Sequence, residues 1–203
     1  WNLLGNPYPC TISWNATLKG NIQDAVYVYD PATSNYMSYV NGLGSNGGSE
    51  FLAPMQGFFV RAKSPNATLN INHDSKRENE SSFKGATLQS LIRLSATDAE
   101  GRKDESLVRL EPAATAQFDD AFDAYKLKAS ASATPQLYSI FNGDEYSINS
   151  IPEATVNTVI PFELLVKTTG TQQIAATELT GLDATLDVVL EDLQTGARTL
   201  LAN

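Results

Sequence analysis

The sequence contains one cysteine and one histidine, and this scarcity limits the chemistry available to the chain. With Cys10 alone, no intrachain disulfide or cysteine-rich metal site can form, and we interpret the thiol beside Pro9 as a small buried apolar group. A nucleophilic triad would depend on His73 alone, and neither a Gly-x-Ser-x-Gly elbow nor a phosphate-binding glycine loop accompanies it. We interpret His73 as an exposed polar residue and predict that the protein is not an enzyme.

Positive charge and long apolar runs are also scarce. The 203 residues include 14 Lys and Arg against 23 Asp and Glu, which gives a formal charge of −9. Phosphate backbones attract the opposite sign, so we expect no nucleic-acid partner. The longest nearly apolar run, residues 159–166, is far shorter than the ~20 residues that a membrane helix needs. We therefore expect no membrane span.

The sequence does contain the alternating pattern of β-strands. Residues 25–30 (AVYVYD) and 36–40 (YMSYV) flank turn-forming residues and predict a hairpin. The glycine-rich run at 41–50 predicts a flexible loop, and 121–128 is the one stretch that suggests a short helical turn. Further strands are expected at 1–4, 58–62, 67–73, 87–96, 105–111, 137–141, 145–149, 158–166, 171–179, 185–193 and 197–202.

A polar, charged interval at residues 73–82 (HDSKRENESS) separates two regions of different composition. The first is rich in aromatic residues, and the second, from Phe83 onward, is rich in Ala, Thr, Leu and Val. Such an interval is typical of a linker between domains. We therefore predict an all-β protein with two antiparallel β-sandwich domains of jelly-roll or immunoglobulin-like type in tandem. The first, residues 1–80, is an aromatic-rich β domain lacking upstream strands, and the second is a β-sandwich at residues 81–203.

The first domain offers a candidate binding surface, since residues 1–62 hold ten of the eighteen aromatic residues. Aromatic rings stack on the apolar faces of sugars while Asn side chains hydrogen-bond their hydroxyls. The alternative is that most of these rings form the core of a small domain, and we favour it for any single ring. The candidate ligand-binding residues are Trp14, Tyr36, Tyr39 and Phe59, and the alternative core consists of Trp1, Tyr27, Tyr29, Phe58 and Phe59.

Phe58 and Phe59 are adjacent, so in a strand they point to opposite faces. Phe58 shares its face with Val60 and Ala62 and is the better core candidate. Phe59 shares its face with Arg61. We expect Phe59 to pack against the neighbouring domain or upstream strands, with a sugar-binding face as the alternative.

One acidic cluster is a candidate for metal binding. Asp119, Asp120 and Asp123 lie on a single short segment, which cannot place two carboxylates on opposite sides of a sugar ring as glycoside hydrolysis requires. Oxygen-rich loops bind Ca²⁺, but no spacing here matches the EF-hand pattern. We expect these carboxylates to cap backbone amides and expect no cofactor, with Ca²⁺ as the alternative.

Six motifs occur in order along the chain, namely WNLLGNPYP, AVYVYDPATSNY, APMQGFFVRA, FDDAFDAYKL, YSINSIPE and TELTGLDATLDVVLEDLQTG. In this succession the chain resembles the C-terminal β-sandwich region of large secreted and cell-surface proteins of Bacteroidetes. That region often precedes a sorting domain of the type IX secretion system. The resemblance covers nearly the whole chain and implies export and surface display within a larger precursor, more than any one activity.

These observations lead to one function hypothesis and two alternatives. We predict a non-catalytic structural and adhesive surface module of a larger secreted bacterial protein, either secreted or attached to the cell surface. The first alternative is a carbohydrate-binding module with its ligand on the aromatic first domain, and the second is an enzyme whose carboxylates meet only in three dimensions. The expected partners are neighbouring domains of the same precursor, together with a polysaccharide or a host surface protein.

Overall fold

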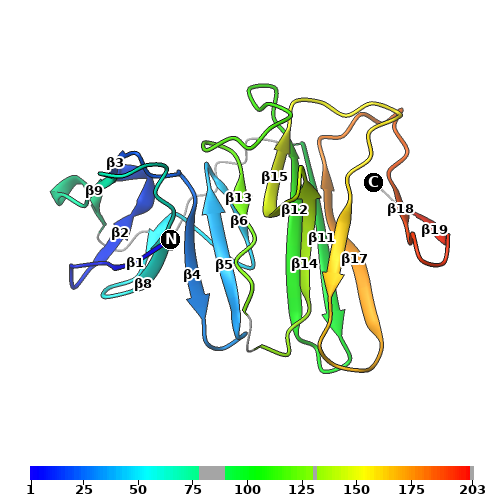
Figure 1. Ribbon diagram of the computed structural model, residues 1–203, viewed down its shortest axis with the longest axis horizontal. Coiled ribbons are helices and arrows are strands. Elements are labelled where there is room, and N and C mark those ends of the chain that lie inside the picture. Colours follow the sequence, from blue (N-terminus) through cyan, green and yellow to red (C-terminus); the bar gives the residue numbers. More distant parts are fainter. Residues whose placement is uncertain (78–89, 130–131, 202–203) are drawn as a thin grey trace.

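The computed structural model describes residues 1–77, 90–129 and 132–201, and within these ranges the protein is all-β, as predicted (Figure 1). We call residues 1–77 the first half and residues 90–201 the second half. In Figure 1 the two halves follow one another along the longest axis, with the first half on the left. The helices of the described residues are two 3-10 turns, η1 (Trp14–Ala16) and η2 (His73–Ser75).

The first half contains three sheets. The largest has the strand order β1-β8-β4-β5-β6, and smaller sheets have the orders β10-β2-β7 and β3-β9. The predicted hairpin is confirmed, with Val26 of β4 opposite Tyr39 of β5. The bounds are β1 (Asn2–Gly5), β2 (Thr11–Ser13), β3 (Leu18–Gly20), β4 (Val26–Asp30), β5 (Asn35–Val40), β6 (Leu43–Ser45), β7 (Phe51–Leu52), β8 (Gly57–Val60), β9 (Thr68–Asn70) and β10 (Lys76–Arg77).

The flexible loop predicted at residues 41–50 is wrong, because β6 lies within this run and pairs with β5. Its glycines allow neighbouring backbone segments to pack closely. A Cβ atom on Gly44 would lie 1.8 Å from the carbonyl oxygen of Gly48, and one on Gly48 would lie 2.1 Å from that of Ser38. Only residues without a Cβ fit this packing.

The predicted linker at 73–82 is described only in part. Residues 73–75 form η2, and Lys76 and Arg77 form β10, which pairs with β2. Residues 78–82 lie outside the described residues, as does the start of the strand predicted at 87–96. The domain boundary predicted at residues 80 and 81 therefore stays a prediction.

The second half is built on one sheet of seven strands. Its main order is β16-β14-β15-β12-β11-β17, and β13 pairs with β15. A separate hairpin joins β18 and β19. The bounds are β11 (Ser90–Asp98), β12 (Lys103–Leu110), β13 (Ala124–Tyr125), β14 (Gln136–Phe141), β15 (Asp144–Ile151), β16 (Phe162–Leu165), β17 (Gln172–Thr180), β18 (Val189–Glu191) and β19 (Arg198–Leu200).

Two features of this half differ from the sequence prediction. The pairing of β12 with β15 is parallel, whereas only antiparallel pairs were expected. A long connection through β13 and β14 separates these two strands, as a parallel pair requires. The helical turn predicted at 121–128 is wrong, because Ala124 and Tyr125 form β13 there and bind the edge of β15.

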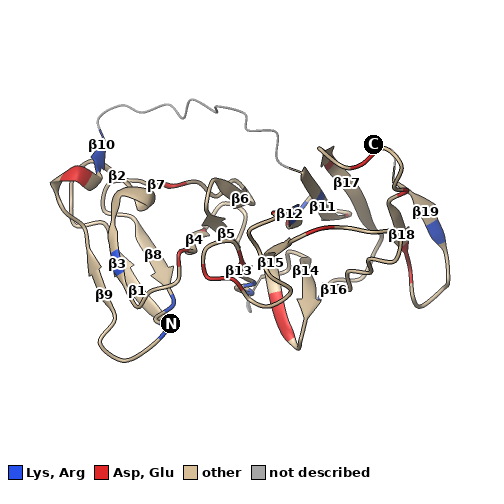
Figure 2. Ribbon diagram, turned by 90° about the horizontal axis from the view of Figure 1, so that it is seen from above, with Lys and Arg blue, Asp and Glu red and all other residues tan. Residues whose placement is uncertain are grey.

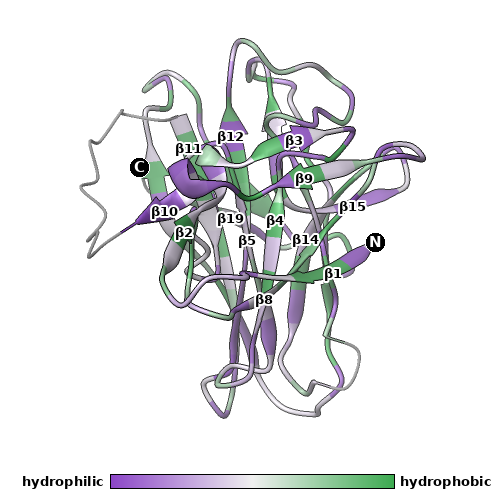
Figure 3. Ribbon diagram, turned by 90° about the vertical axis from the view of Figure 1, so that its left-hand side faces the viewer, coloured by the Kyte–Doolittle hydropathy of each residue, from purple (hydrophilic) through white to green (hydrophobic). Residues whose placement is uncertain are grey.

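The core of the described residues consists of three clusters, and the first two lie on opposite faces of the five-stranded sheet. Because successive side chains of a strand alternate, Val26 of β4 enters one cluster and Tyr27 the other. Figure 3 views the molecule from the end of the first half and shows hydrophobic segments in β1 and β4. The first-half cluster comprises Ile12, Trp14, Ile22, Val26, Tyr39, Leu52, Phe58 and Val60. The junction cluster comprises Ala25, Tyr27, Val40, Leu43, Leu91, Leu107, Ala124 and Ile148.

The junction cluster joins the two halves, since four of its eight members come from each of them. No sheet within the described residues contains strands of both halves. The five-stranded sheet is thus a middle layer between the small sheets of the first half and the seven-stranded sheet. A third cluster, centred on Leu94, Ala96 and Leu137, lies wholly in the second half.

Candidate functional site

A row of aromatic side chains crosses the surface where the two halves meet. We call this row the junction ridge, and it consists of Trp1, Arg61, Phe118 and Tyr125, with Tyr27 and Tyr146 beneath. The Trp1 side chain is 54% exposed, while Tyr27 and Tyr146 are buried. The first half contributes the guanidinium and two of the rings, and the second half contributes the other three rings. The ridge therefore exists only when the halves are docked.

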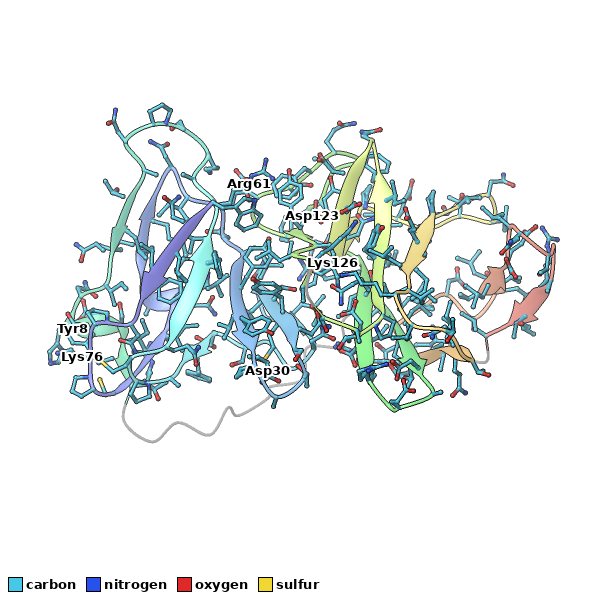
Figure 4. The ribbon with its side chains drawn as sticks, turned by 60° about the horizontal axis from the view of Figure 1, so that its bottom comes forward. Tyr8, Asp30, Arg61, Lys76, Asp123 and Lys126 are labelled. Carbon is cyan, nitrogen blue, oxygen red and sulfur yellow. The ribbon has the colours of Figure 1, made fainter. Side chains whose placement is uncertain are left out.

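Strand pairing explains how the ridge forms. Asn2 of β1 lies opposite Val60 of β8, which places the preceding Trp1 beside the following Arg61. The Arg61 guanidinium lies 5.8 Å from the Trp1 ring centre and 4.2 Å from that of Tyr125. Such cation–π contacts hold both rings to the guanidinium, and Figure 4 labels Arg61 where the two halves meet.

The ridge continues into the second half by ring stacking. Phe118 and Tyr125 stack with ring centres 4.4 Å apart, and Tyr125 and Tyr146 stack at 5.5 Å. Tyr27 anchors the row from the first half, because its hydroxyl oxygen accepts a hydrogen bond of 2.9 Å from the Tyr125 amide. Trp1 in turn meets Tyr27 edge to face at 5.1 Å.

The ridge has one charged side chain. Tyrosine phenols are neutral at pH 7, and desolvation raises the pKa of Tyr27, Tyr125 and Tyr146 still further above 7. Of the six side chains, only that of Arg61 is charged. Flat apolar rings beside a single guanidinium suit a ligand with an apolar face and an acidic or hydroxyl-rich edge.

The predicted residues Trp14 and Tyr39 lie in the first-half cluster. Trp14 is 1% exposed, meets Phe58 edge to face at 5.9 Å and donates its indole N–H to the Asp24 carbonyl oxygen. The Tyr39 hydroxyl oxygen accepts a hydrogen bond of 2.8 Å from the Asn15 side chain. Neither ring offers a face to solvent.

Tyr36 and Phe59, the other two predicted residues, lie together with ring centres 5.9 Å apart. Tyr36 also meets Tyr29, which is 41% exposed, at 5.2 Å. Phe58 is buried, as predicted, while Phe59 is half-buried and packs against the junction cluster. The structure thus brings Tyr36 and Phe59 together and separates them from Trp14.

The core membership proposed for Trp1 and Tyr29 is wrong, because both are exposed. Sequence reasoning also missed Arg61, Phe118 and Tyr125 as members of a common surface. The one signal that pointed to Arg61 was its place on the same strand face as Phe59.

The acidic cluster is engaged in local contacts. The Asp119 carboxylate accepts a hydrogen bond from the Thr115 amide, and the Asp123 carboxylate accepts bonds from the amides of Asp119 and Ser150. The predicted capping of backbone amides is thus confirmed for Asp119 and Asp123. Asp120 instead pairs with Lys63 at 2.9 Å.

Burial raises the pKa of Asp123 to about 6. Within residues 1–77, 90–129 and 132–201, no three His, Cys, Asp or Glu residues are grouped so that they hold a metal ion.

A groove of about 510 Å³ lies in the first half. Its walls carry no acidic or basic side chain, so it offers no group for acid–base catalysis. It is lined by Asn2, Leu4, Gly5, Ile22, Val60, Ala62, Ser64, Asn66, Ala67, Leu69 and Ile71. A smaller cavity of about 190 Å³ lies beside β4 and β5.

The two scarce residues differ in exposure. His73 is exposed in η2, as predicted, whereas Cys10 is half-buried rather than buried. Acidic and basic segments are dispersed over both halves in Figure 2 and do not gather on one face. In the described part of the chain, no helix is long and apolar enough to cross a membrane.

One family model, described as a domain of unknown function (DUF8693), matches residues 1–203, the whole chain. No curated protein and no solved structure matches this chain. The description of the family names no activity, so a function has to be argued from the geometry.

Proposed function

We propose that this chain, which belongs to the DUF8693 family over its whole length, is a non-catalytic structural and adhesive module of a larger secreted bacterial protein. It would space and present neighbouring domains at the cell surface, in keeping with its resemblance to C-terminal regions of Bacteroidetes surface proteins. The observation that carries this proposal is the junction cluster, a buried apolar core shared by both halves.

Directional hydrogen bonds add to this apolar contact. Two side chains of the second half donate to carbonyl oxygens of the first. The Arg93 guanidinium donates to the Gly44 carbonyl oxygen at 3.0 Å, and the Thr134 hydroxyl donates to the Thr33 carbonyl oxygen at 3.0 Å. Such bonds fix orientation, which a purely apolar contact does not. We therefore propose two β-sandwich domains in tandem, residues 1–80 and 81–203, docked as one stiff unit.

A deletion within the precursor tests this function. Removing residues 1–203 should reduce surface display and adhesion of the cells, while any catalytic activity of the remaining domains, measured on solubilised protein, should persist. Unchanged display and adhesion would contradict the structural and adhesive role.

A second candidate function, carbohydrate binding, is favoured by the exposed junction ridge. Trp1 offers a solvent-facing ring beside Arg61, the arrangement on which sugar rings stack. A glycan array should then detect a ligand whose binding is lost in Trp1→Ala and kept in Tyr36→Ala. If glycan binding is lost in Tyr36→Ala alone, the site is at Tyr36 and Phe59. If the wild-type protein binds no glycan on the array, this function is rejected.

A further inference from the structure

The most completely buried charges of the described residues lie between the two halves, around the carboxylate of Asp104. Its Oδ1 accepts hydrogen bonds from the side-chain amides of Asn35 at 2.8 Å and Asn46 at 2.7 Å. Its Oδ2 accepts hydrogen bonds from the Lys126 ammonium and from the Leu137 amide, the latter at 2.6 Å. Figure 4 shows Lys126 in the middle of the molecule, between the halves.

The pair of Lys126 and Asp104 differs in burial from the other ion pairs of the described residues. Its side chains are 2% and 0% exposed. Those of Lys128 and Glu145, a pair made by a lysine two residues away, are 30% and 37% exposed. A fully buried ion pair bears the desolvation cost of both charges and is weak evidence for stability, so this site invites a chemical explanation.

We propose that Lys126 and Asp104 condense to an intramolecular isopeptide bond. The Lys126 ammonium transfers a proton to the Asp104 carboxylate, and the neutral amine then adds to Cγ of Asp104. The C–Oδ2 bond breaks, and Oδ2 leaves as water carrying two of the three ammonium protons. One Nζ–Cγ bond forms, one C–O bond breaks, the two charges cancel, and no oxidant or other reactant is needed.

The surroundings of Asp104 favour each step. The proton has a direct path, because the Lys126 ammonium already donates a hydrogen bond to Oδ2, the oxygen that leaves. Contact between the nucleophile and the acyl group supplies proximity, which in well-oriented intramolecular reactions reaches effective concentrations of ~10⁵–10⁸ M.

The two asparagine amides complete the arrangement. When Nζ adds to Cγ, negative charge develops on Oδ1, and Asn35 and Asn46 already donate to that atom. Donors placed in advance at a developing oxyanion lower the barrier of acyl transfer. Both donors come from the first half, so the reaction should follow docking of the halves.

The bond would have a structural consequence that does not depend on the proposed function. It would close a covalent loop from β12 to the segment after β13, and this loop carries Phe118 and Tyr125 of the junction ridge. Cross-linking constrains the unfolded chain and thereby stabilises the folded one, as a disulfide does.

The experiment is mass spectrometry of the purified chain. We expect an intact mass lower than the sequence mass by one water molecule. Trypsin should then release one branched species, residues 104–109 joined to residues 110–128 with Lys126 uncleaved. The full sequence mass, with 104–109 and 110–126 released as separate peptides, would overturn the proposal. Loss of ammonia, with Lys126 joined to Asn35 or Asn46, would overturn it equally.

Matched lysine variants control the assignment. Lys126→Arg keeps the charge but forms no stable amide, so its mass should be unshifted, whereas Lys128→Arg should still lose water. An unshifted mass in Lys128→Arg would count against the proposal. Asn46→Ala removes one oxyanion donor and should slow the loss of water about 100-fold, by analogy with other oxyanion holes. If Lys126→Arg does not fold, the tryptic map of the wild type decides alone.

Discussion

Truncation of Leu107 should reveal whether the two halves unfold together. Leu107 belongs to the second half, is 0% exposed and shares the junction cluster with Tyr27 and Val40 of the first half. Replacing a fully buried leucine by alanine costs about 3 kcal/mol or more through lost burial and the cavity that remains. For a chain of this size, about 3 kcal/mol corresponds to a melting temperature lower by roughly 6–12 °C.

The assay uses the position of the tryptophans, since both lie in the first half. In a Trp1→Phe background, fluorescence of the buried Trp14 reports on the first half alone, while circular dichroism reports on all strands. Leu107→Ala should lower both midpoints equally, because a shared core transmits the loss. Leu193→Ala is the matched control, since Leu193 is 86% exposed and its truncation should shift neither midpoint.

A particular result would refute this reasoning. If Leu107→Ala lowers the circular dichroism midpoint and leaves the Trp14 midpoint unchanged, the halves unfold independently. The junction cluster would then be a contact between separate domains, and the proposal of one stiff unit would be lost.

Three further predictions concern single positions. The pKa of Asp123 is raised to about 6 from an ordinary value of ~3.9, so the folded protein holds this proton more tightly. Its contribution to the free energy of unfolding should be present below pH ~4 and be lost as pH rises to about 6, and carboxyl NMR should show a midpoint near 6. Gly48→Ala would place Cβ 2.1 Å from the Ser38 carbonyl oxygen and should destabilise the protein strongly. In Gly47→Ala the new Cβ meets open space, and the cost of about 1 kcal/mol comes from the backbone φ of +84° alone. Equal melting temperatures of the two variants would contradict this. Chelators should leave the melting temperature unchanged, whereas a calcium-dependent rise that disappears in Asp119→Ala would show a metal site.

Local patterns in the sequence predicted the longer strands well. The hairpin of β4 and β5 follows from alternation around a polar turn, and the burial of Phe58 follows from its apolar neighbours on one strand face. Strands of two or three residues, such as β6, β7 and β13, are too short to show a period and were missed. The glycine run was misread because a close backbone approach depends on what packs against it, which composition does not record.

The junction ridge and the Asp104 site were not predictable for a related reason. Arg61 and Tyr125 are distant in sequence and belong to different halves, and so do Asn35 and Asp104. Single-sequence periodicity says which face a residue takes within its own strand but not which strand faces it. These sites depend on how the two halves dock, and docking is determined by many apolar contacts at once.

The aromatic content of the first half follows from the layered arrangement. A sheet with one dry face alternates apolar and polar residues, whereas a middle layer needs large apolar side chains on both faces. The sequence VYVYD of β4 meets this need by giving valine to the first-half cluster and Tyr27 to the junction cluster. Rings that a core requires are poor evidence for a ligand. The informative rings are the exposed ones, and in this half they are Trp1 and Tyr29, at 54% and 41% exposure. Of these two, Trp1 is the one with a cation beside it within the described part of the chain, so the search for a ligand should begin at Trp1 and Arg61.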